Sequence, residues 1–267
     1  MRKQLPFAKF SATGNDFILF DNREHDLKGD EIAFFQRICA RRTGVGADGI
    51  LLIEDSGGTD YRLRYFNADG YETEMCGNGA RAAAFYAFHN GLAPIHCKFE
   101  INDNMYEAIV EGKAVSLLMH APTNMNLEPG VLLDEGLEEG GIAEIGVPHY
   151  VLFAKDVSGV DVDRLGKKYC EHEFFQPRRT NVNFVSTNPL GEMEIRTYER
   201  GVDTETLSCG TGTVVSAFIA SERLGKMFPM AFKTRGGTLT VSIDEKAGRP
   251  LLHGEVQMPF MGDVFYE

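Results

Sequence analysis

The sequence predicts an α+β protein made of two similar, pseudo-symmetric halves, in each of which strands pack around a central helix. Two observations predict this fold. The chain resembles itself at offsets of 132 to 137 residues. Each half also contains short strand-like runs and one helix-like stretch that is apolar on several faces. A helix that is apolar nearly all round is buried rather than lying on a surface.

The internal repeat is strongest around two of the five cysteines. The matching segments are, in chain order, 13–20 with 145–153, 41–46 with 178–183, 64–67 (RYFN) with 196–199 (RTYE), and 72–79 (ETEMCGNG) with 205–212 (ETLSCGTG). We therefore predict a duplicated fold, with one half in residues 1–120 and the other in 121–256. The polar, proline-marked stretch 121–124 is the expected join, and the tail from about 257 to 267 is expected to return to the first half.

The expected elements follow from apolar patterning. The strand-like runs are Phe17–Phe20, Ile50–Ile53, Tyr150–Phe153, Val182–Val185 and Gly254–Phe260. The helix-like stretches are Ala80–His89 and Thr213–Arg223, and each directly follows a Cys-Gly-x-Gly segment. Each cysteine is therefore expected at the start of a buried helix.

Composition excludes several classes of function. The formal net charge of −12 argues against nonspecific nucleic-acid binding. No apolar run reaches the roughly 18 residues of a membrane span, so a cytoplasmic location is the default expectation. Five widely spaced cysteines without a CxxC pair disfavour a disulfide framework or a structural zinc site. Cys39, Cys97 and Cys170 are expected to be inert core residues.

The two Cys-Gly-x-Gly segments predict proton chemistry. Backbone N–H groups at a helix N-terminus bind carboxylates and stabilise a thiolate. If the halves pack about a pseudo-twofold axis, Cys76 and Cys209 lie on opposite faces of one substrate carbon. A thiolate on one face removes the α-proton and a thiol on the other supplies one, so the configuration inverts. No Walker loop, placed dinucleotide fingerprint or HExxH motif is present, and we expect neither a cofactor nor a metal.

The chain resembles the diaminopimelate epimerase family over nearly its whole length. The resemblance is carried by residues 14–17 (GNDF), 44–49 (GVGADG), 67–81 (NADG to MCGNGAR), 148–149 (PH) and 198–212 (YERG to SCGTG). It implies cofactor-independent interconversion of LL- and meso-diaminopimelate in lysine and cell-wall precursor synthesis. It also implies two domains, each a strongly curved, mostly antiparallel, barrel-like sheet around a central helix, and a possible homodimer.

The resemblance also implies roles for individual residues. Cys76 and Cys209 would be the acid–base pair, and backbone groups at Gly77-Asn78 and Gly210-Thr211 would hold the reacting carboxylate. At the distal end, Glu199 suits the ammonium group, and Arg200 with the amides of Asn67 and Asn181 suits the carboxylate. Asn15 would line the same cleft, and His149 and Glu199 would tune the thiols. The alternatives are a surface ion pair between Glu199 and Arg200, asparagines that serve turns, and a core histidine.

Four positions depart from the family pattern. Val147 stands where many members have an asparagine that contacts the distal carboxylate, and Gly49 stands where some have a glutamine. An insertion around Asp203 lengthens the loop before Cys209, and Ala82 follows Arg81 where a cysteine is frequent. None of these changes the predicted catalytic pair, but Val147 bears on recognition of the distal end.

Two rival functions remain open at this point. A proline or hydroxyproline racemase would also use two cysteines, but its first motif usually carries histidine where Asn78 stands. A non-catalytic amino-acid-binding protein would keep the cleft and bind without exchanging a proton. Isotope exchange in heavy water, with diaminopimelate and with proline, separates these functions.

Overall fold

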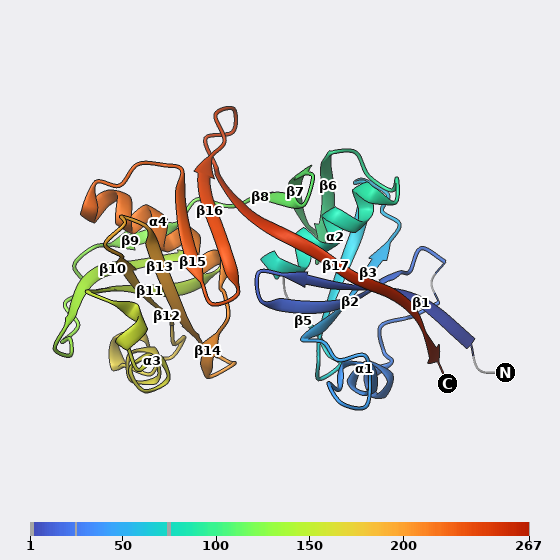
Figure 1. Cartoon of the computed structure of the whole chain (residues 1–267), viewed down its shortest axis with the longest axis horizontal. Helices are drawn as coiled ribbons and strands as arrows, with labels where there is room; N and C mark the ends of the chain where they lie inside the picture. The colour runs from blue at the N-terminus through green and yellow to red at the C-terminus, as the bar shows by residue number, and fades with distance from the viewer. Residues whose placement is uncertain (1–2, 25, 74–75, 267) are drawn as a thin grey trace. The chain divides into compact units, whose positions relative to one another are not determined.

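The chain folds into two compact units, which the computed structural model describes over residues 3–24, 26–73 and 76–266. Unit 1 comprises Met1–Leu118 and Gly254–Glu267, and unit 2 comprises Met119–His253. The last strand, β17 (Pro250–Tyr266), therefore contributes its first residues to unit 2 and the rest to unit 1. Figure 1 shows its path from one unit into the other.

Unit 1 is a sheet closed on itself around a helix. Its helices are α1 (Ile32–Cys39) and α2 (Gly77–His89). Its strands, besides β17, are β1 (Lys3–Ala12), β2 (Asn15–Asp21), β3 (Gly49–Glu54), β4 (Tyr61–Asn67), β5 (Glu72–Thr73), β6 (His96–Ile101), β7 (Asn104–Glu111) and β8 (Ala114–Leu118). Because β17 pairs with both β1 and β8, the sheet closes into a barrel.

Unit 2 is built from the same kinds of element. Its helices are α3 (Val162–Cys170) and α4 (Gly210–Leu224), with short 3₁₀ turns η1 (Val157–Gly159) and η2 (Glu173–Phe175). Its strands, besides the start of β17, are β9 (Thr123–Asn126), β10 (Leu137–Ile145), β11 (Val147–Ala154), β12 (Asn181–Thr187), β13 (Met193–Glu199), β14 (Thr204–Thr206), β15 (Met230–Thr234) and β16 (Gly237–Ile243).

Strand pairing repeats between the units. In unit 1, β2 pairs parallel with β3, β3 antiparallel with β4, and β4 parallel with β6. In unit 2, β11 pairs parallel with β12, β12 antiparallel with β13, and β13 parallel with β15. The short strands β5 and β14 lie antiparallel to β4 and β13 and lead to the two cysteine-bearing helices. The pairs β1–β2, β6–β7 and β7–β8 in unit 1, and β10–β11 and β15–β16 in unit 2, are antiparallel, so the sheet of each unit is mixed but mostly antiparallel.

A central helix is buried against the sheet in each unit. Helix α2 packs against β1, β2, β7 and β8, and α4 packs against β10, β11, β12 and β16. The small side chains Ala80, Ala83, Ala84 and Ala87 of α2 are fully buried, which lets the helix lie close to the surrounding strands. Both helices begin three residues earlier than predicted, at the glycine that follows each cysteine. Glycine carries no apolar side chain, so the periodicity did not show this first turn.

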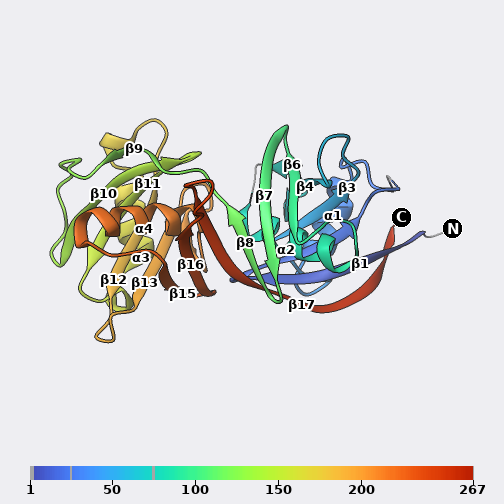
Figure 2. The same cartoon turned by 90° about the horizontal axis from the view of Figure 1, so that it is seen from above.

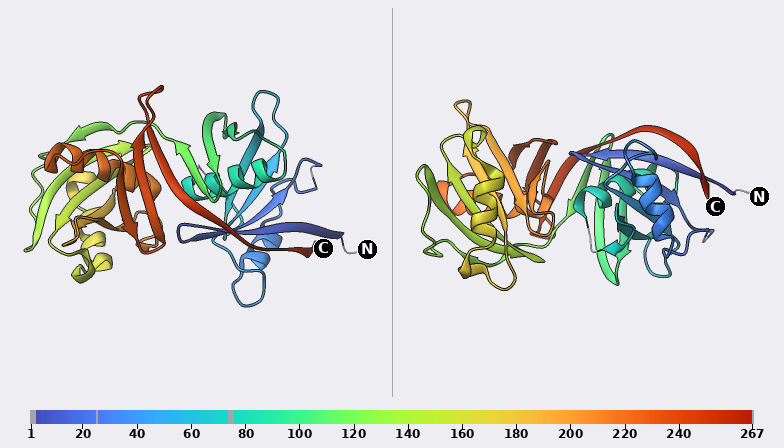
Figure 3. Two further views of the ribbon diagram at one scale, coloured as in Figure 1. Left: turned by 45° about the horizontal axis from the view of Figure 1, so that its top comes forward. Right: turned by 90° about the horizontal axis from the view of Figure 1, so that it is seen from below.

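A second, outer helix covers the other side of the strands in each unit. Figures 1 and 3 show α1 and α2 on opposite sides of the unit 1 strands, and Figure 2 shows α4 along the unit 2 sheet. The apolar face of α1, with Phe35 and Ile38, packs on Ile18, Ile50 and Phe66. The apolar face of α3 packs in the same way on buried residues of β11, β12 and β13, namely Tyr150, Leu152, Val182, Phe184 and Tyr198.

The predicted fold class is therefore confirmed. The chain is α+β, with two similar units, each a curved, mostly antiparallel sheet around a central helix. The strand-like runs at 17–20, 50–53, 150–153, 182–185 and 254–260 all lie within strands. No helix in the described part of the chain is both long and apolar enough to span a membrane.

Candidate active site

Both predicted catalytic cysteines cap a central helix. Cys76 is the N-cap residue of α2 (φ −110°, ψ 116°), and Cys209 is the N-cap residue of α4 (φ −128°, ψ 113°). Their carbonyls accept the first helical hydrogen bonds, from Ala80 at 2.8 Å and from Thr213 at 3.0 Å. Neither thiol caps its own helix. The segment before Cys76 includes Glu74 and Met75 of the predicted motif, which lie outside the described residues.

The glycines of the Cys-Gly-x-Gly segments bring each helix start against the sheet. A Cβ on Gly79 would lie 3.1 Å from Leu51 Cδ2. A Cβ on Gly212 would clash with the Asn183 amide oxygen and would lie 3.3 Å from the Cys209 Sγ atom. A side chain at position 212 would therefore displace the Asn183 amide group, the thiol or both.

Cys209 lies beside a buried carboxyl group. Glu199, at the end of β13, accepts a hydrogen bond from Thr206 Oγ1 at 2.6 Å and another from the Cys209 side chain. Burial raises the pKa of Glu199, and these two hydrogen bonds oppose that rise. Thr211 Oγ1 also lies 3.5 Å from Cys209 Sγ. The thiol is thus held by a carboxyl group from β13 and a hydroxyl from its own helix.

Cys76 lies near a buried guanidinium instead. Arg81, one turn into α2, is fully buried, and burial lowers its pKa to about 10 while the charge of Cys76 opposes that fall. Its Nη2 atom donates to Thr13 Oγ1 at 2.8 Å and to Asn78 Oδ1 at 2.6 Å. The repeat places Val214 at the equivalent position of α4. The two cysteines therefore share a backbone setting but differ in the charge beside them.

Two of the predicted binding residues of unit 1, Asn15 and Asn78, belong to one hydrogen-bonded chain. Asn78 Nδ2 donates to Asn15 Oδ1 at 2.7 Å, and Asn15 Nδ2 donates to Asp48 Oδ2 at 3.0 Å. Asp48 in turn receives hydrogen bonds from Arg41 and from the Asp16 backbone. Asn67 is exposed at the end of β4, and its backbone closes the turn that leads to β5. Asp48 was not predicted as a site residue.

An ion network fixes the loop that carries Asp48. Asp16 is bound by Lys9 at 2.7 Å and by Arg41 at 2.8 Å. Burial raises the pKa of Asp16, but these two cations outweigh burial and lower it to about 2. Lys9 is itself buried and also donates to the Gly46 carbonyl. The network explains the GNDF and GVGADG segments, because it joins their acidic residues.

The predicted residues of unit 2 are also connected. Asn181, buried at the start of β12, accepts from the Arg200 backbone at 3.0 Å, and Arg200 Nη1 donates to the Arg178 carbonyl at 2.6 Å. No ion pair joins Glu199 to Arg200 within the described part of the chain. The surface ion pair considered above is therefore not what orients these two side chains.

His149 is fully buried on β11. Its Nδ1 atom lies 3.3 Å from Asn183 Nδ2, and Asn183 Oδ1 accepts from Thr197 at 3.0 Å. Burial, followed by the charge of Arg200, lowers the pKa of His149 to about 3, so the imidazole is neutral near pH 7. Asn183 was not predicted, although the 41–46 and 178–183 match contains it. Only its contacts with His149 and with the start of α4 mark it as part of the site.

The other three cysteines behave as core residues. Cys39 and Cys170 lie on the inner faces of the outer helices, and Cys97 lies in β6. Burial raises the pKa of Cys39 to about 12, that of Cys97 to about 11, and that of Cys170 in the same direction. Thiols of such high pKa are weak nucleophiles at neutral pH.

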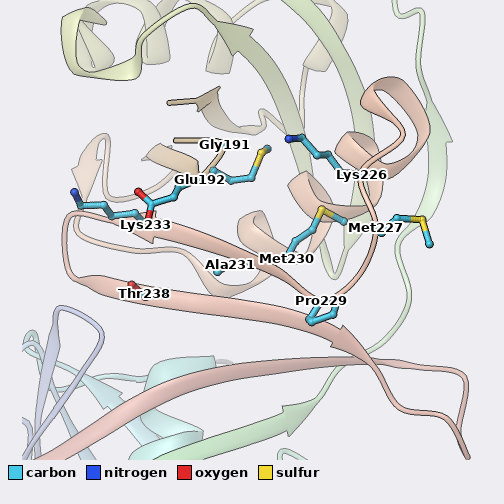
Figure 4. A pocket seen from close by; sticks show the side chains of 10 residues that line it. Gly191, Glu192, Lys226, Met227, Pro229, Met230, Ala231, Lys233 and Thr238 are labelled. Carbon is cyan, nitrogen blue, oxygen red and sulfur yellow. The ribbon is translucent and has the colours of Figure 1, made fainter. Parts of the chain in front are cut away.

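Two cavities lie away from these residues. A cavity of about 340 Å³ in unit 2 lies between β15 and the end of α4, with Lys226, Met230 and Lys233 in its wall (Figure 4). A larger one of about 570 Å³ in unit 1 is lined by Asp21, Arg23 and Tyr86. Neither cavity is lined by a predicted site residue. Within the described residues, no group of three or more His, Cys, Asp or Glu side chains could hold a metal ion.

Solved structures with the same fold define the class of protein. A phenazine biosynthesis protein of the PhzF family from Bacillus anthracis aligns with a TM-score of 0.72 at 16% identity, over 99% of this chain and 100% of that one. A hydroxyproline epimerase from Agrobacterium vitis aligns with a TM-score of 0.66 at 15% identity, over 99% and 92% of the two chains. The chain thus has the duplicated fold shared by these proteins.

Sequence similarity then identifies the family. The family model for diaminopimelate epimerase matches residues 7–122 and 141–259. The diaminopimelate epimerase of Aquifex aeolicus is 37% identical over 98% of this chain and 99% of its own length. That of Chlorobaculum tepidum is 36% identical over 95% and 99%. The chain belongs to the diaminopimelate epimerase family, and its enzyme class is that of the isomerases.

Proposed function

We propose that this protein interconverts LL- and meso-2,6-diaminopimelate by exchanging the proton on one α carbon between two cysteines. The observation that carries the proposal is the repeated setting of Cys76 and Cys209, each at the N-cap of a buried helix with two glycines in its first turn. A single such thiol would suit a nucleophile. Two of them, in a family whose members are named as epimerases, suit a two-base proton exchange.

The helix starts supply the binding site for the reacting carboxylate in this proposal. The first backbone N–H groups of a helix have no partner within it and carry partial positive charge. Those of Gly77-Asn78 and Gly210-Thr211 would hold the carboxylate from both sides. The same groups stabilise negative charge that develops on the carboxylate as the α-proton leaves. No electron-sink cofactor takes part in the proposed reaction.

The two thiols would begin the reaction in different protonation states. The guanidinium of Arg81 favours a thiolate at Cys76, whereas the carboxyl group of Glu199 favours a hydrogen-donating thiol at Cys209. Cys76 would then remove a proton from one face and Cys209 would deliver one to the other face. In the reverse direction the roles exchange. Neutral His149 would help to keep the second thiol in a dry, oriented setting.

The distal end of the substrate would be recognised by polar residues of both units. Arg200, with the amides of Asn67 and Asn181, would bind the second carboxylate, and Glu199 is the acidic group available for the ammonium. Asn15 would line the same site, because its amide is held by Asp48 and Asn78. Val147 supplies no polar group where an asparagine is common in the family, so the other donors must bear more of this recognition.

Heavy-water exchange tests the proposal. The protein is incubated in deuterium oxide with LL-diaminopimelate and, separately, with proline, and deuterium at the α carbon is followed by mass spectrometry. We expect incorporation into diaminopimelate only, and a loss of epimerisation of at least about 10³-fold in Cys76→Ala and Cys209→Ala. Incorporation into proline alone, or binding without exchange, would replace this proposal with one of the two rivals.

The biological setting follows from the same proposal. The reaction would serve lysine and cell-wall precursor synthesis. Five free cysteines suit a reducing, cytoplasmic location. A homodimer is the expected assembly, and sedimentation at micromolar concentration measures it.

A further inference from the structure

A glutamate four residues before each catalytic cysteine forms a bidentate pair with an arginine. In unit 1, Arg64 on β4 binds Glu72 on β5, with Nε–Oε1 and Nη2–Oε2 distances of 3.0 and 2.6 Å. In unit 2, Arg196 on β13 binds Glu205 on β14 at 2.7 Å through both pairs of atoms. These residues occupy equivalent places in the repeat, and the reaction proposed above gives them no role.

Each arginine also ties the hairpin to the outer layer of its unit. Arg64 Nη1 donates to the Lys28 carbonyl at 2.9 Å, ahead of α1. Arg196 Nη1 donates to the carbonyls of Val157 and Val160 at 2.9 and 2.8 Å, ahead of α3. A planar guanidinium with five donors can hold a carboxylate through two parallel hydrogen bonds and still donate to backbone carbonyls.

The unit 2 pair has further anchors. Glu205 is buried with a side-chain exposure of 8% and also receives Arg235 at 2.8 Å. Its backbone N–H and the Thr204 hydroxyl both donate to Asp163 on α3, at 2.7 and 2.9 Å. Strand β14 is thus held against α3 by side-chain and backbone contacts, at the same end of the unit (Figure 1).

Strand geometry connects this anchor to the thiol. Successive side chains on a strand point to opposite faces, so Glu205 faces the outer layer while Thr206 faces the inside. Thr206 donates to Glu199, and Glu199 is hydrogen-bonded to Cys209. A shift of β14 would therefore move the carboxyl group that orients the thiol. A displacement of about 1 Å at reacting groups can cost about 100-fold in rate.

We propose that the pairs Arg64–Glu72 and Arg196–Glu205 are positioning clamps, each of which fixes the short strand that precedes one catalytic cysteine, β5 before Cys76 and β14 before Cys209. The expected effect on kcat rests on the proposed two-cysteine function, whereas the expected effect on thiol labelling does not. The clamps act on the thiol of their own unit. The clamp of unit 2 has the larger effect, because Glu205 is more buried than Glu72 and binds two arginines.

The kinetic test compares Glu205→Gln and Glu72→Gln with wild type. We expect kcat for diaminopimelate to fall by about tenfold or more in Glu205→Gln and by a smaller factor in Glu72→Gln, with KM changed by less than about threefold. The matched control is Arg164→Gln, which breaks the exposed Arg164–Asp161 pair of α3 and leaves both parameters unchanged. A kcat of Glu205→Gln within about twofold of wild type, or an effect confined to KM, overturns the proposal.

Site-resolved alkylation tests the clamps without any epimerase activity. Iodoacetamide labelling at high pH, where thiols are ionised, is followed for each cysteine by peptide mass spectrometry. We expect Glu205→Gln to speed labelling of Cys209 by about threefold or more with Cys76 unchanged, and Glu72→Gln to do the reverse. Equal responses of both thiols, or none, contradict the clamps. If wild type lacks epimerase activity, the proposed function fails while this readout still decides the clamps.

A milder variant covers the case in which Glu205→Gln does not fold. Asp163 lies on the exposed side of α3. The substitution Asp163→Asn weakens the hydrogen bond that holds the Glu205 backbone N–H, without removing a buried charge. It is expected to speed Cys209 labelling in the same direction, and an unchanged Cys209 rate in a folded Asp163→Asn protein counts against the clamp.

Discussion

The side chains around the two cysteines differ although the backbone around them is repeated. Cys209 is hydrogen-bonded to Glu199, whereas Cys76 lies near Arg81. The repeat puts Val214 where Arg81 stands, so the second half carries no positive group at that position. Opposite charges beside otherwise equivalent thiols give each a different preferred protonation state, which a two-base exchange requires at the start of each turnover.

Replacing Glu199 tests this electrostatic difference. In Glu199→Gln the carboxylate that disfavours a Cys209 thiolate is gone, so the pH midpoint for alkylation of Cys209 is expected to fall. The midpoint for Cys76 stays where it is. Alkylation rates between about pH 6 and pH 10, resolved by peptide, measure both. Glu194→Gln on the same strand is the control, and an upward shift at Cys209 would contradict the assignment.

His149 predicts how stability depends on pH. Its pKa is lowered from 6.5 to about 3 in the folded protein. Below pH 6.5 the unfolded chain takes up a proton that the folded protein does not, so stability falls as the pH drops toward 3. Relative to neutral pH, this difference in proton uptake lowers the free energy of unfolding by about 3 kcal/mol at about pH 4. Urea unfolding of wild type and His149→Asn at several pH values isolates the contribution of His149. If the free energy of unfolding changes equally with pH in the two proteins, this prediction is refuted.

At the scale of elements, the helix starts depend on glycines that apolar periodicity does not detect. The predicted helices began at Ala80 and Thr213, but α2 and α4 begin at Gly77 and Gly210. The five predicted strand runs all lie within strands, and four of them are short, continuous buried runs rich in β-branched and aromatic residues. The hydrogen-bonding partners of the site residues were not predicted, because residues such as Asp48 and Asn183 are brought to the site by parallel pairing of segments far apart in sequence.

Gly212→Ala tests the close approach of α4 to the sheet. The added Cβ meets the Asn183 amide and the Cys209 sulfur, so we expect a loss of about 1–3 kcal/mol in the free energy of unfolding together with a fall in kcat. Gly159→Ala is the control, since a Cβ there meets nothing within 4 Å. Chemical denaturation measures the stability, and equal behaviour of the two variants would show that the contact is not restrictive.

At the scale of the whole molecule, duplication explains why so much was predictable. Each unit repeats one order of strands and helices, and the family model matches once in each half. The self-similar segments therefore predicted the fold class and also singled out Cys76 and Cys209 as the candidate catalytic residues. Sequence could not give the ion network of Asp16 or the clamp at Glu205, because these pairings depend on which side chains the strand registers bring within hydrogen-bonding distance.

Oxidation tests whether the two thiols can meet. If both units contribute to one site, mild oxidation is expected to join Cys76 to Cys209, lowering the intact mass by about 2 Da and abolishing activity until a thiol reductant is added. Peptide mapping identifies the bond, and Cys209→Ala serves as the control that cannot form it. An inactive oxidised protein with both thiols still free would contradict a shared site.

A crystal structure with diaminopimelate, or an unreactive analogue, bound to the protein tests the central claim most directly. The quantity to measure is the distance from each sulfur to the reacting α carbon. The account predicts that Cys76 Sγ and Cys209 Sγ both lie within about 3.5 Å of that carbon, on opposite faces. A ligand whose α carbon is approached by only one sulfur, with the other beyond about 6 Å, would contradict it.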